Sequence, residues 1–260
     1  TLIALGLADS LIRRADRVGY FRPVHLGDTP AQDPRVRLMQ ETFGLDDDAA
    51  RGGVSLAQCR EYLASGQQDE LVSVCLAVYA QMAPSYDVVI VDGTDLLAHN
   101  AATAEFDLNA RLANTMDCSV LAVINGGEAE SVEDIVNSVE VTRSELHAAR
   151  TDLLGVVVNR VDPEWAQEVA ERTPAGRRGG HVYVIPENPA ISQPTVADVI
   201  RSLALDDTAL GASADRDIQA VKVAAMTVGN FLEQMGDGDF IITPADRADV
   251  VMATLASALS

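Results

Sequence analysis

The sequence is poor in lysine and cysteine, and each shortage excludes a kind of site. Of the 19 lysine and arginine residues, Lys222 is the one lysine. A Walker-type phosphate-binding loop requires a lysine, and none stands near Thr1. The three cysteines, Cys59, Cys75 and Cys118, are odd in number, widely spaced and without a CxxC pair. This usage is typical of free or buried thiols in a reducing compartment and argues against a disulfide framework.

Long apolar runs, a secretory leader and excess positive charge are also missing. No apolar run is long enough to span a bilayer, and no basic leader precedes the first helical pattern, so we expect a cytoplasmic protein without a membrane partner. The four histidines show no metal-ligand spacing. The formal net charge of −20 argues against a nucleic-acid partner, which would need a basic surface. Helix N-termini and loop amides can still bind phosphate groups in an acidic chain.

The clearest structural signal is an apolar run that ends in an acidic residue. Residues 88–91 are four consecutive aliphatic side chains, followed by Asp92 and Gly93. Such a run is typical of a strand buried on both faces of a parallel sheet. Ligands collect at the carboxyl ends of parallel strands, and nucleotide-hydrolysing folds hold magnesium with a carboxylate there. Asp92 is therefore a candidate magnesium ligand; the alternative is that it only caps the next turn.

Similar strands alternate with amphipathic helices over residues 1–192, which predicts a doubly wound, mostly parallel α/β sheet. The predicted strands are residues 18–21, 88–91, 120–124, 156–158 and 182–185. We interpret residues 25–53 as a long loop with one short helix at residues 36–43. Residues 1–14 have helical spacing. Because a chain rarely begins inside an amphipathic helix, we expect a first strand and turn to precede them.

The pattern changes near residue 192, where we place a domain boundary. Residues 193–260 predict a small α/β domain with a helix at residues 195–205, two short strands and a helix between residues 220 and 243, and a last helix from residue 245. A chain of 260 residues is long enough for one large domain and a smaller one. We expect the smaller domain to be incomplete.

Several motifs together resemble long-form bacterial phosphate acetyltransferases. The most specific is FDLNARLAN at residues 106–114, in which Asp107 and Arg111 are spaced for an ion pair within one helix. The others are LIALGL (2–7), VGYFRPV (18–24), VIVDGTD (89–95), the strands at 120–126 and 155–161, VIPE (184–187), PTVAD (194–198), AAM (224–226), NFL (230–232) and IITPADRADV (241–250). The resemblance covers essentially the whole chain.

This resemblance implies both a fold and a role. Residues 1–192 are similar to a dethiobiotin synthetase-like P-loop domain that lacks its first strand and phosphate loop. Residues 193–260 are similar to the first part of a DRTGG domain. The family converts acetyl-CoA and phosphate reversibly to acetyl phosphate and CoA, and these two domains are regarded as regulatory and assembly-promoting. The acetyl-transfer domain lies further toward the C-terminus, and nothing here resembles it. The resemblance implies self-association, small-molecule effectors and no acetyl transfer by this chain alone.

The resemblance also implies a remnant nucleotide site. Thr1 would match the hydroxyl residue that closes a Walker A loop and meets magnesium, or else it is simply an N-terminal helix residue. Asn159 follows a strand where related synthetases place an adenine-reading asparagine, although it could equally cap a turn. No cofactor is predicted firmly. A magnesium–nucleotide complex would bind weakly through Thr1, Asp92 and Asn159, because the lysine-bearing loop is missing.

Two other functions remain open at this point. The first is an ATP-dependent ligase of the dethiobiotin or cobyrinate synthetase type. Arg22 stands where those synthetases carry a lysine, and an arginine cannot be deprotonated to act as a nucleophile or form a carbamate. That departure, the missing glycine-rich loop and the added DRTGG segment argue against a ligase. The second is a free-standing regulatory protein of the same two-domain plan.

Overall fold

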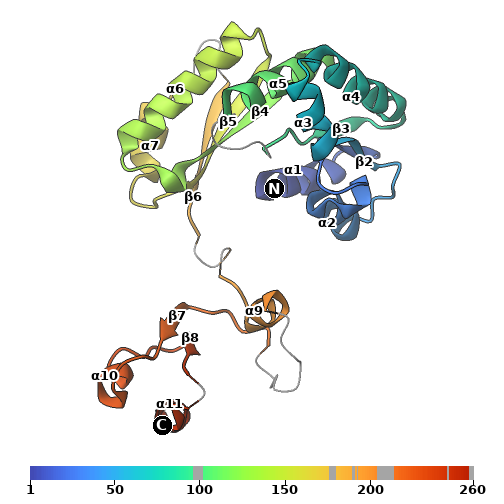
Figure 1. The fold of residues 1–260 in the computed structure, drawn as a ribbon. Coiled ribbons are helices and arrows are strands. Elements are labelled where there is room, and N and C mark those ends of the chain that lie inside the picture. Colours follow the sequence, from blue (N-terminus) through green and yellow to red (C-terminus); the bar gives the residue numbers. More distant parts are fainter. Residues whose placement is uncertain are drawn as a thin grey trace. The chain divides into compact units, whose positions relative to one another are not determined.

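The chain folds into two compact units, Thr1–Pro186 and Glu187–Ser260, which are drawn in Figure 1. Each unit is described by itself here, from a computed structural model. The structure describes residues 1–95, 102–175, 180–188, 191, 193–203, 214–244 and 246–257. The division between the units falls after residue 186, whereas the sequence pattern places the domain boundary near residue 192.

The first sheet of the first unit has three parallel strands. β1 (Val18–His25) lies in the centre, between β2 (Ala50–Ser55) and β3 (Val88–Val91). Every residue of β1 is buried, as expected for the central strand of a parallel sheet with helices on both faces. Successive side chains point to opposite faces, so Tyr20 packs in one core cluster and Phe21 in another.

Helices cover both faces of this sheet. The face of Tyr20 carries α1 (Leu2–Ile12) and α2 (Pro34–Phe43), and the face of Phe21 carries α3 (Leu56–Ala64), α4 (Gln68–Met82) and α5 (Ala102–Thr115). Full burial of one large apolar side chain contributes about 1.5–3 kcal/mol. The two apolar layers therefore hold the strands in place and fix the positions of the residues that follow them.

β2 corrects the prediction that residues 25–53 form a long loop with one short helix. The helix is present as α2, but residues 50–55 form a strand that pairs in parallel with β1. Its sequence, ARGGVS, contains two glycines and an arginine, so hydrophobic patterning did not reveal it. Gly53 is required by packing, because a Cβ atom there would lie 2.5 Å from the carbonyl oxygen of Pro23.

A second parallel sheet completes the first unit. It contains β4 (Val120–Asn125), β5 (Leu153–Val161) and β6 (His181–Pro186), with β5 in the centre. Residues of α6 (Val132–Ala148) and α7 (Ala166–Arg172) pack with one face of these strands in a single apolar cluster, and Figure 1 shows both helices beside the sheet.

The five predicted strands are all present and the pairs they form are parallel, so the α/β prediction is confirmed. Within the first unit, the described strands lie in two three-stranded sheets rather than in the single sheet that the prediction assumed. Aliphatic runs predict that a strand is buried, but they do not say which strand lies beside it. Short 3-10 helices occur at Pro30–Gln32, Ala83–Ser85 and Gly126–Glu128. No described helix has the length and apolar character needed to cross a membrane.

The second unit is a small α/β arrangement, as the sequence predicts. β7 (Ala220–Val223) and β8 (Asp239–Ile242) pair in parallel and are connected through α10 (Val228–Leu232). α9 (Val196–Ser202) precedes the strands and α11 (Ala248–Ser257) follows them. The buried core of this unit consists of Ala224, Phe231 and Val250, with Met226, Val228, Met235 and Ile241 packed against it.

We expect Gly53→Ala to destabilise the first unit, because the new methyl group would clash with the backbone of β1 at Pro23. Overpacking of this kind typically costs about 1–3 kcal/mol. Gly6→Ala is the matched control, since Gly6 lies inside α1 with nothing within 4 Å of an added Cβ, and alanine is favoured over glycine in a helix by about 1 kcal/mol. Urea denaturation followed by circular dichroism measures both variants. Equal stability of the two variants would contradict the close approach of β2 to β1.

Candidate functional site

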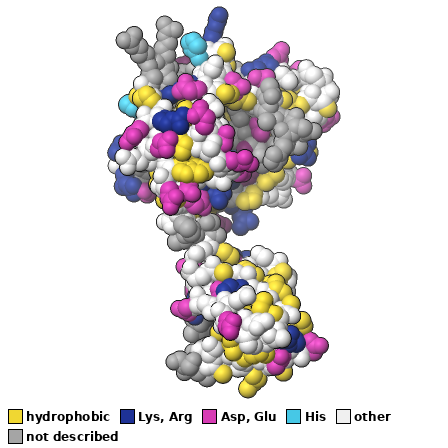
Figure 2. Space-filling model, turned by 90° about the vertical axis from the view of Figure 1, so that its left-hand side faces the viewer, with side chains coloured by type: hydrophobic (Ala, Val, Ile, Leu, Met, Phe, Trp, Pro, Cys, Tyr) yellow, Lys and Arg dark blue, Asp and Glu magenta, His cyan; other side chains and the backbone are white. Residues whose placement is uncertain are grey.

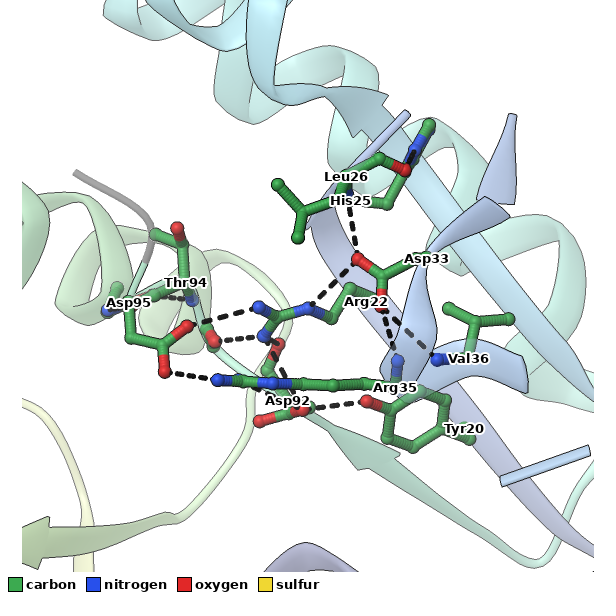
Figure 3. A network of polar contacts seen from close by, with 12 residues as sticks. Tyr20, Arg22, His25, Leu26, Asp33, Arg35, Val36, Asp92, Thr94 and Asp95 are labelled. Carbon is green, nitrogen blue, oxygen red and sulfur yellow. Dashed lines mark hydrogen bonds and ion pairs between the residues drawn. The ribbon is translucent and has the colours of Figure 1, made fainter. Parts of the chain in front are cut away.

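Asp92 lies at the carboxyl end of β3, where the sequence predicts it. Its backbone N–H donates to the carbonyl oxygen of Phe21 at 2.9 Å, which extends the pairing of β3 with β1 by one residue. Its carboxylate accepts a hydrogen bond from the Tyr20 hydroxyl at 2.6 Å, within the network shown in Figure 3. Oδ2 of Asp92 also lies 3.4 Å from Arg22 Nη1 and 3.7 Å from Arg35 Nη1. The carboxylate is therefore held by one hydroxyl and two guanidinium groups.

Arg22 is the buried centre of this network. It belongs to β1, and its side chain is 1% exposed. Nη1 donates to the carbonyl oxygens of Asp92 and Gly93 at 3.1 and 2.6 Å, and Nη2 donates to Asp95 Oδ1 at 3.1 Å. Nε lies 3.8 Å from Asp33 Oδ2 and has no hydrogen-bond partner among the described residues. Because an unpaired charge in a protein interior is costly, Arg22 can be buried only with these acceptors around it.

Asp33 and Arg35 connect α2 to the network. Asp33 is the N-cap of α2, and its carboxylate accepts from the backbone N–H groups of Arg35, Val36 and Leu26 at 2.8, 3.3 and 2.7 Å. An N-cap of this type contributes about 1 kcal/mol. Arg35 lies in the first turn of α2 and donates from Nη2 to Asp95 Oδ2 at 2.5 Å. The start of α2 is thus fixed against the ends of β1 and β3.

The surroundings shift the pKa values of two acidic groups in this network, Tyr20 and Asp95. Burial, and after it the neighbouring Asp92 carboxylate, raises the pKa of Tyr20 far above its ordinary value, so the hydroxyl remains a donor. Partial burial acts to raise the pKa of Asp95. The hydrogen bonds and charges of Arg35 and Arg22 outweigh that effect and hold the pKa of Asp95 below its ordinary value. Both shifts favour the hydrogen bonds that the structure contains.

These contacts bear on the magnesium role predicted for Asp92. Magnesium takes oxygen ligands in near-ideal octahedral geometry, and a protein usually supplies one or two carboxylates while waters and phosphate oxygens complete the shell. Oδ2 of Asp92 already accepts a hydrogen bond from Tyr20, and the guanidinium groups of Arg22 and Arg35 would repel a second cation at this short range. The residues present do not fit a magnesium–nucleotide complex at Asp92; they fit an internal ion-pair network.

The other two predicted site residues, Thr1 and Asn159, lie on elements other than β3, which Asp92 follows. Thr1 is the N-cap of α1 and makes no capping hydrogen bond with its side chain. Asn159 lies in β5, paired with Asn125 of β4. Over the described part of the chain, no hydrogen bond or ion pair joins Thr1 or Asn159 to Asp92. No group of three or more His, Cys, Asp or Glu side chains that could hold a metal occurs among the described residues. The nucleotide-site role of these three residues stays a prediction.

Sequence patterning missed Tyr20, Asp33, Arg35 and Asp95 as members of the site. One signal for them was present, because Arg22 interrupts an otherwise apolar strand, and a charge at such a position requires partners. Asp95 lies 73 residues from Arg22 along the chain. A partner at that separation is brought close only by the pairing of β1 with β3, which no local pattern specifies.

Arg111 has a different partner from the one that its spacing predicts. The i,i+4 spacing suggests an ion pair with Asp107 inside α5. In the structure Arg111 donates to the carboxylate of Asp69 and, at 3.1 Å, to Oε1 of Gln68, both on α4. The arginine therefore connects two neighbouring helices.

We expect Arg22→Ala to lower the free energy of unfolding by about 3–5 kcal/mol, because it leaves buried acceptors without their donor. Arg17→Ala is the matched control: Arg17 donates to Asp87 at 2.9 Å, and their side chains are 59% and 42% exposed. Exposed pairs contribute about 1 kcal/mol or less. Urea denaturation of both variants at neutral pH provides the comparison. Similar losses for the two arginines would contradict the buried-charge interpretation of Arg22.

Comparison with known proteins identifies two domain families along the chain. An AAA domain matches residues 1–195, and a DRTGG domain matches residues 204–260. The phosphate acetyltransferase of Nitratidesulfovibrio vulgaris is 32% identical to this chain over an alignment of 267 residues. The alignment covers 99% of this chain and 37% of that protein. The phosphate acetyltransferase of Pseudomonas putida is 28% identical and that of Salmonella typhimurium 24%; each is matched by 100% of this chain, over 38% and 39% of its own length.

The chain thus spans less than two-fifths of the length of these curated relatives. The two domain families and their order agree with the prediction from the sequence. The chain belongs to the AAA domain family over residues 1–195, continues into a DRTGG domain, and resembles the N-terminal part of long-form phosphate acetyltransferases.

Proposed function

We propose that this chain is the regulatory and assembly region of a phosphate acetyltransferase and that it performs no acetyl transfer by itself. The observation that carries the proposal is the match of essentially the whole chain to only 37–39% of proteins named phosphate acetyltransferase. The AAA and DRTGG domains account for residues 1–195 and 204–260, so a separate acetyl-transfer domain would have to belong to the remaining part of the whole protein. We propose that the whole protein acts in the cytoplasm.

The geometry around Asp92 supports a non-catalytic role for the first unit. The polar groups at the carboxyl edge of β1 and β3 bind one another: Arg22 contacts Asp92 and Asp95, and Arg35 contacts the same two carboxylates. A nucleophile or general base needs a free lone pair directed at a substrate, and a buried guanidinium cannot supply one. This argues against the ligase alternative. Nucleotide binding through Thr1, Asp92 and Asn159 would be weak or absent, because the Asp92 carboxylate is already paired with Tyr20 and two arginines.

The second unit supports a role in assembly. Figure 2 shows apolar side chains exposed on this unit. Val221 and Val223 of β7 are 56% and 61% exposed, and Ile242, which pairs with Val223, is 49% exposed. Adjacent exposed aliphatic residues on one face of a sheet are typical of an interaction surface. We propose that copies of the chain associate through this face of β7 and β8.

We expect the purified chain to release no CoA from acetyl-CoA and phosphate above a blank without protein. The measurement is a thiol assay for CoA under conditions in which the full-length phosphate acetyltransferase of Nitratidesulfovibrio vulgaris, the positive control, turns over. Turnover that rises in proportion to the concentration of this chain would contradict the proposal, because it would place acetyl transfer within these two domains.

We expect the chain to sediment as an oligomer at micromolar concentration, and Val223→Asp to shift it toward the monomer, because a buried unpaired carboxylate is costly at an apolar contact. Asn230→Asp is the matched control: it adds the same charge at an exposed position of α10 in the same unit. Sedimentation velocity distinguishes the species. A monomeric wild-type chain, or equal dissociation of both variants, would contradict assembly through β7 and β8.

A further inference from the structure

The Asp95 carboxylate bridges two arginines whose side chains are much less exposed than its own. Its Oδ1 accepts from Arg22 Nη2 at 3.1 Å, and its Oδ2 accepts from Arg35 Nη2 at 2.5 Å. The side chains of Arg22 and Arg35 are 1% and 23% exposed, whereas that of Asp95 is 55% exposed. In Figure 3 both guanidinium groups point toward the two oxygens of this carboxylate. The arginines therefore form the inner side of the contact, and Asp95 covers them from the solvent side.

This geometry is that of an oxyanion site. Two guanidinium donors that each reach a different oxygen of one carboxylate match the bidentate recognition of carboxylate and phosphate groups. Arg22 is held independently of Asp95, because its Nη1 donates to the carbonyl oxygens of Asp92 and Gly93. Arg35 begins in the first turn of α2, and its Nη1 lies 3.7 Å from Asp92 Oδ2, an ion pair that does not involve Asp95. Both donors would keep their positions if Asp95 turned away.

Asp95 is the member of the contact that can move. It follows β3 without belonging to a helix or strand. The backbone before it is fixed separately, because Thr94 N–H donates to Asn109 Oδ1 at 2.9 Å and Asn109 Nδ2 donates to the Thr94 carbonyl at 2.8 Å. Among the interactions that the described residues make, a rotation of the Asp95 side chain toward solvent would break its two contacts with the arginines. This rotation would release Arg22 Nη2 and Arg35 Nη2. Among the described residues, no other acceptor is paired with both of these atoms.

We propose that Arg22 and Arg35 form a binding site for a small anion that carries a carboxylate or phosphate group, and that the Asp95 carboxylate occupies this site until such an anion displaces it. Asp33 and Asp92 do not compete for the Nη2 donors that Asp95 occupies. Asp33 lies 3.8 Å from Arg22 Nε, and Asp92 lies 3.4 and 3.7 Å from the Nη1 atoms of Arg22 and Arg35. Binding of the anion does not require the regulatory role proposed above. If the regulatory role holds, the anion would be an effector that binds the first unit.

The test removes the internal carboxylate and measures the affinity for external ones. The full chain, Asp95→Ala and Asp95→Asn are titrated separately with inorganic phosphate and with acetate, and binding is followed by NMR of the arginine Nε–H and backbone N–H groups. We expect both variants to bind at least one of the anions about tenfold more tightly than the wild type, because no bidentate charge-assisted contact has to be displaced. A gain with phosphate alone, acetate alone or both identifies the group that the site accepts.

Two controls separate this site from a general change in charge. Asp69→Ala removes one negative charge from another arginine contact, that of Arg111, and should leave both affinities at the wild-type value. Arg35→Gln added to Asp95→Ala should abolish the gain. The proposal is overturned if neither Asp95 variant binds more tightly than Asp69→Ala, or if the gain persists without Arg35. Asp95→Asn, which preserves the size of the side chain, provides the test if Asp95→Ala does not fold. These binding results are independent of the sedimentation and CoA-release measurements.

Discussion

The positive charge of Arg22, buried in the central strand of the first sheet, constrains the structure around it. A guanidinium group in a protein interior must have partners for its charge and its donors, or it destabilises the fold by several kcal/mol. Its partners come from the N-cap of α2, from Asp92 and Gly93, which directly follow β3, and from Asp95. The contacts of this one side chain therefore require α2 and β3 to occupy defined positions beside β1. Nonpolar packing determines how the helices lie on the sheet, and the charge of Arg22 determines where the start of α2 and the carboxyl end of β3 lie beside β1.

The same charge determines what Asp92 can do. At the carboxyl end of a parallel strand, a carboxylate is usually available to a ligand or a metal ion. Here the Asp92 side chain and backbone both contact Arg22, and Tyr20 donates to the carboxylate from the neighbouring strand. The position is that of a ligand site, but the interactions are internal. Position in the fold therefore does not establish a binding role, because the neighbouring side chains decide whether the carboxylate is free.

A structural feature could be predicted from the sequence when its signal lies within one short segment of the chain. The strands at residues 88–91 and 156–158 are continuous aliphatic runs, and such runs need no knowledge of the rest of the chain. β2 was missed because its pairing depends on Gly53 approaching Pro23, which is a property of two segments together. Asp92 was found because it directly follows a strand, whereas Asp33 and Asp95 depend on which elements lie beside Arg22. The resemblance to phosphate acetyltransferases agrees with the comparisons, but the motif at residues 106–114 that contributed to it did not reveal that Arg111 contacts α4.

Exchange of the Asp95 carboxylate for an external anion would have a limited and definable effect on the fold. A ligand can shift a conformational equilibrium only by the difference between its affinities for the two states. The contacts of Arg22 with Asp92 and Gly93 do not involve Asp95, so the pairing of β1 with β3 would be the same in both states. The residue that changes partners lies next to Thr94, which is bonded to Asn109 of α5. Because these hydrogen bonds of Thr94 do not involve the Asp95 side chain, α5 would also keep its place, and the exchange would be confined to Asp95 and to the guanidinium groups of Arg22 and Arg35.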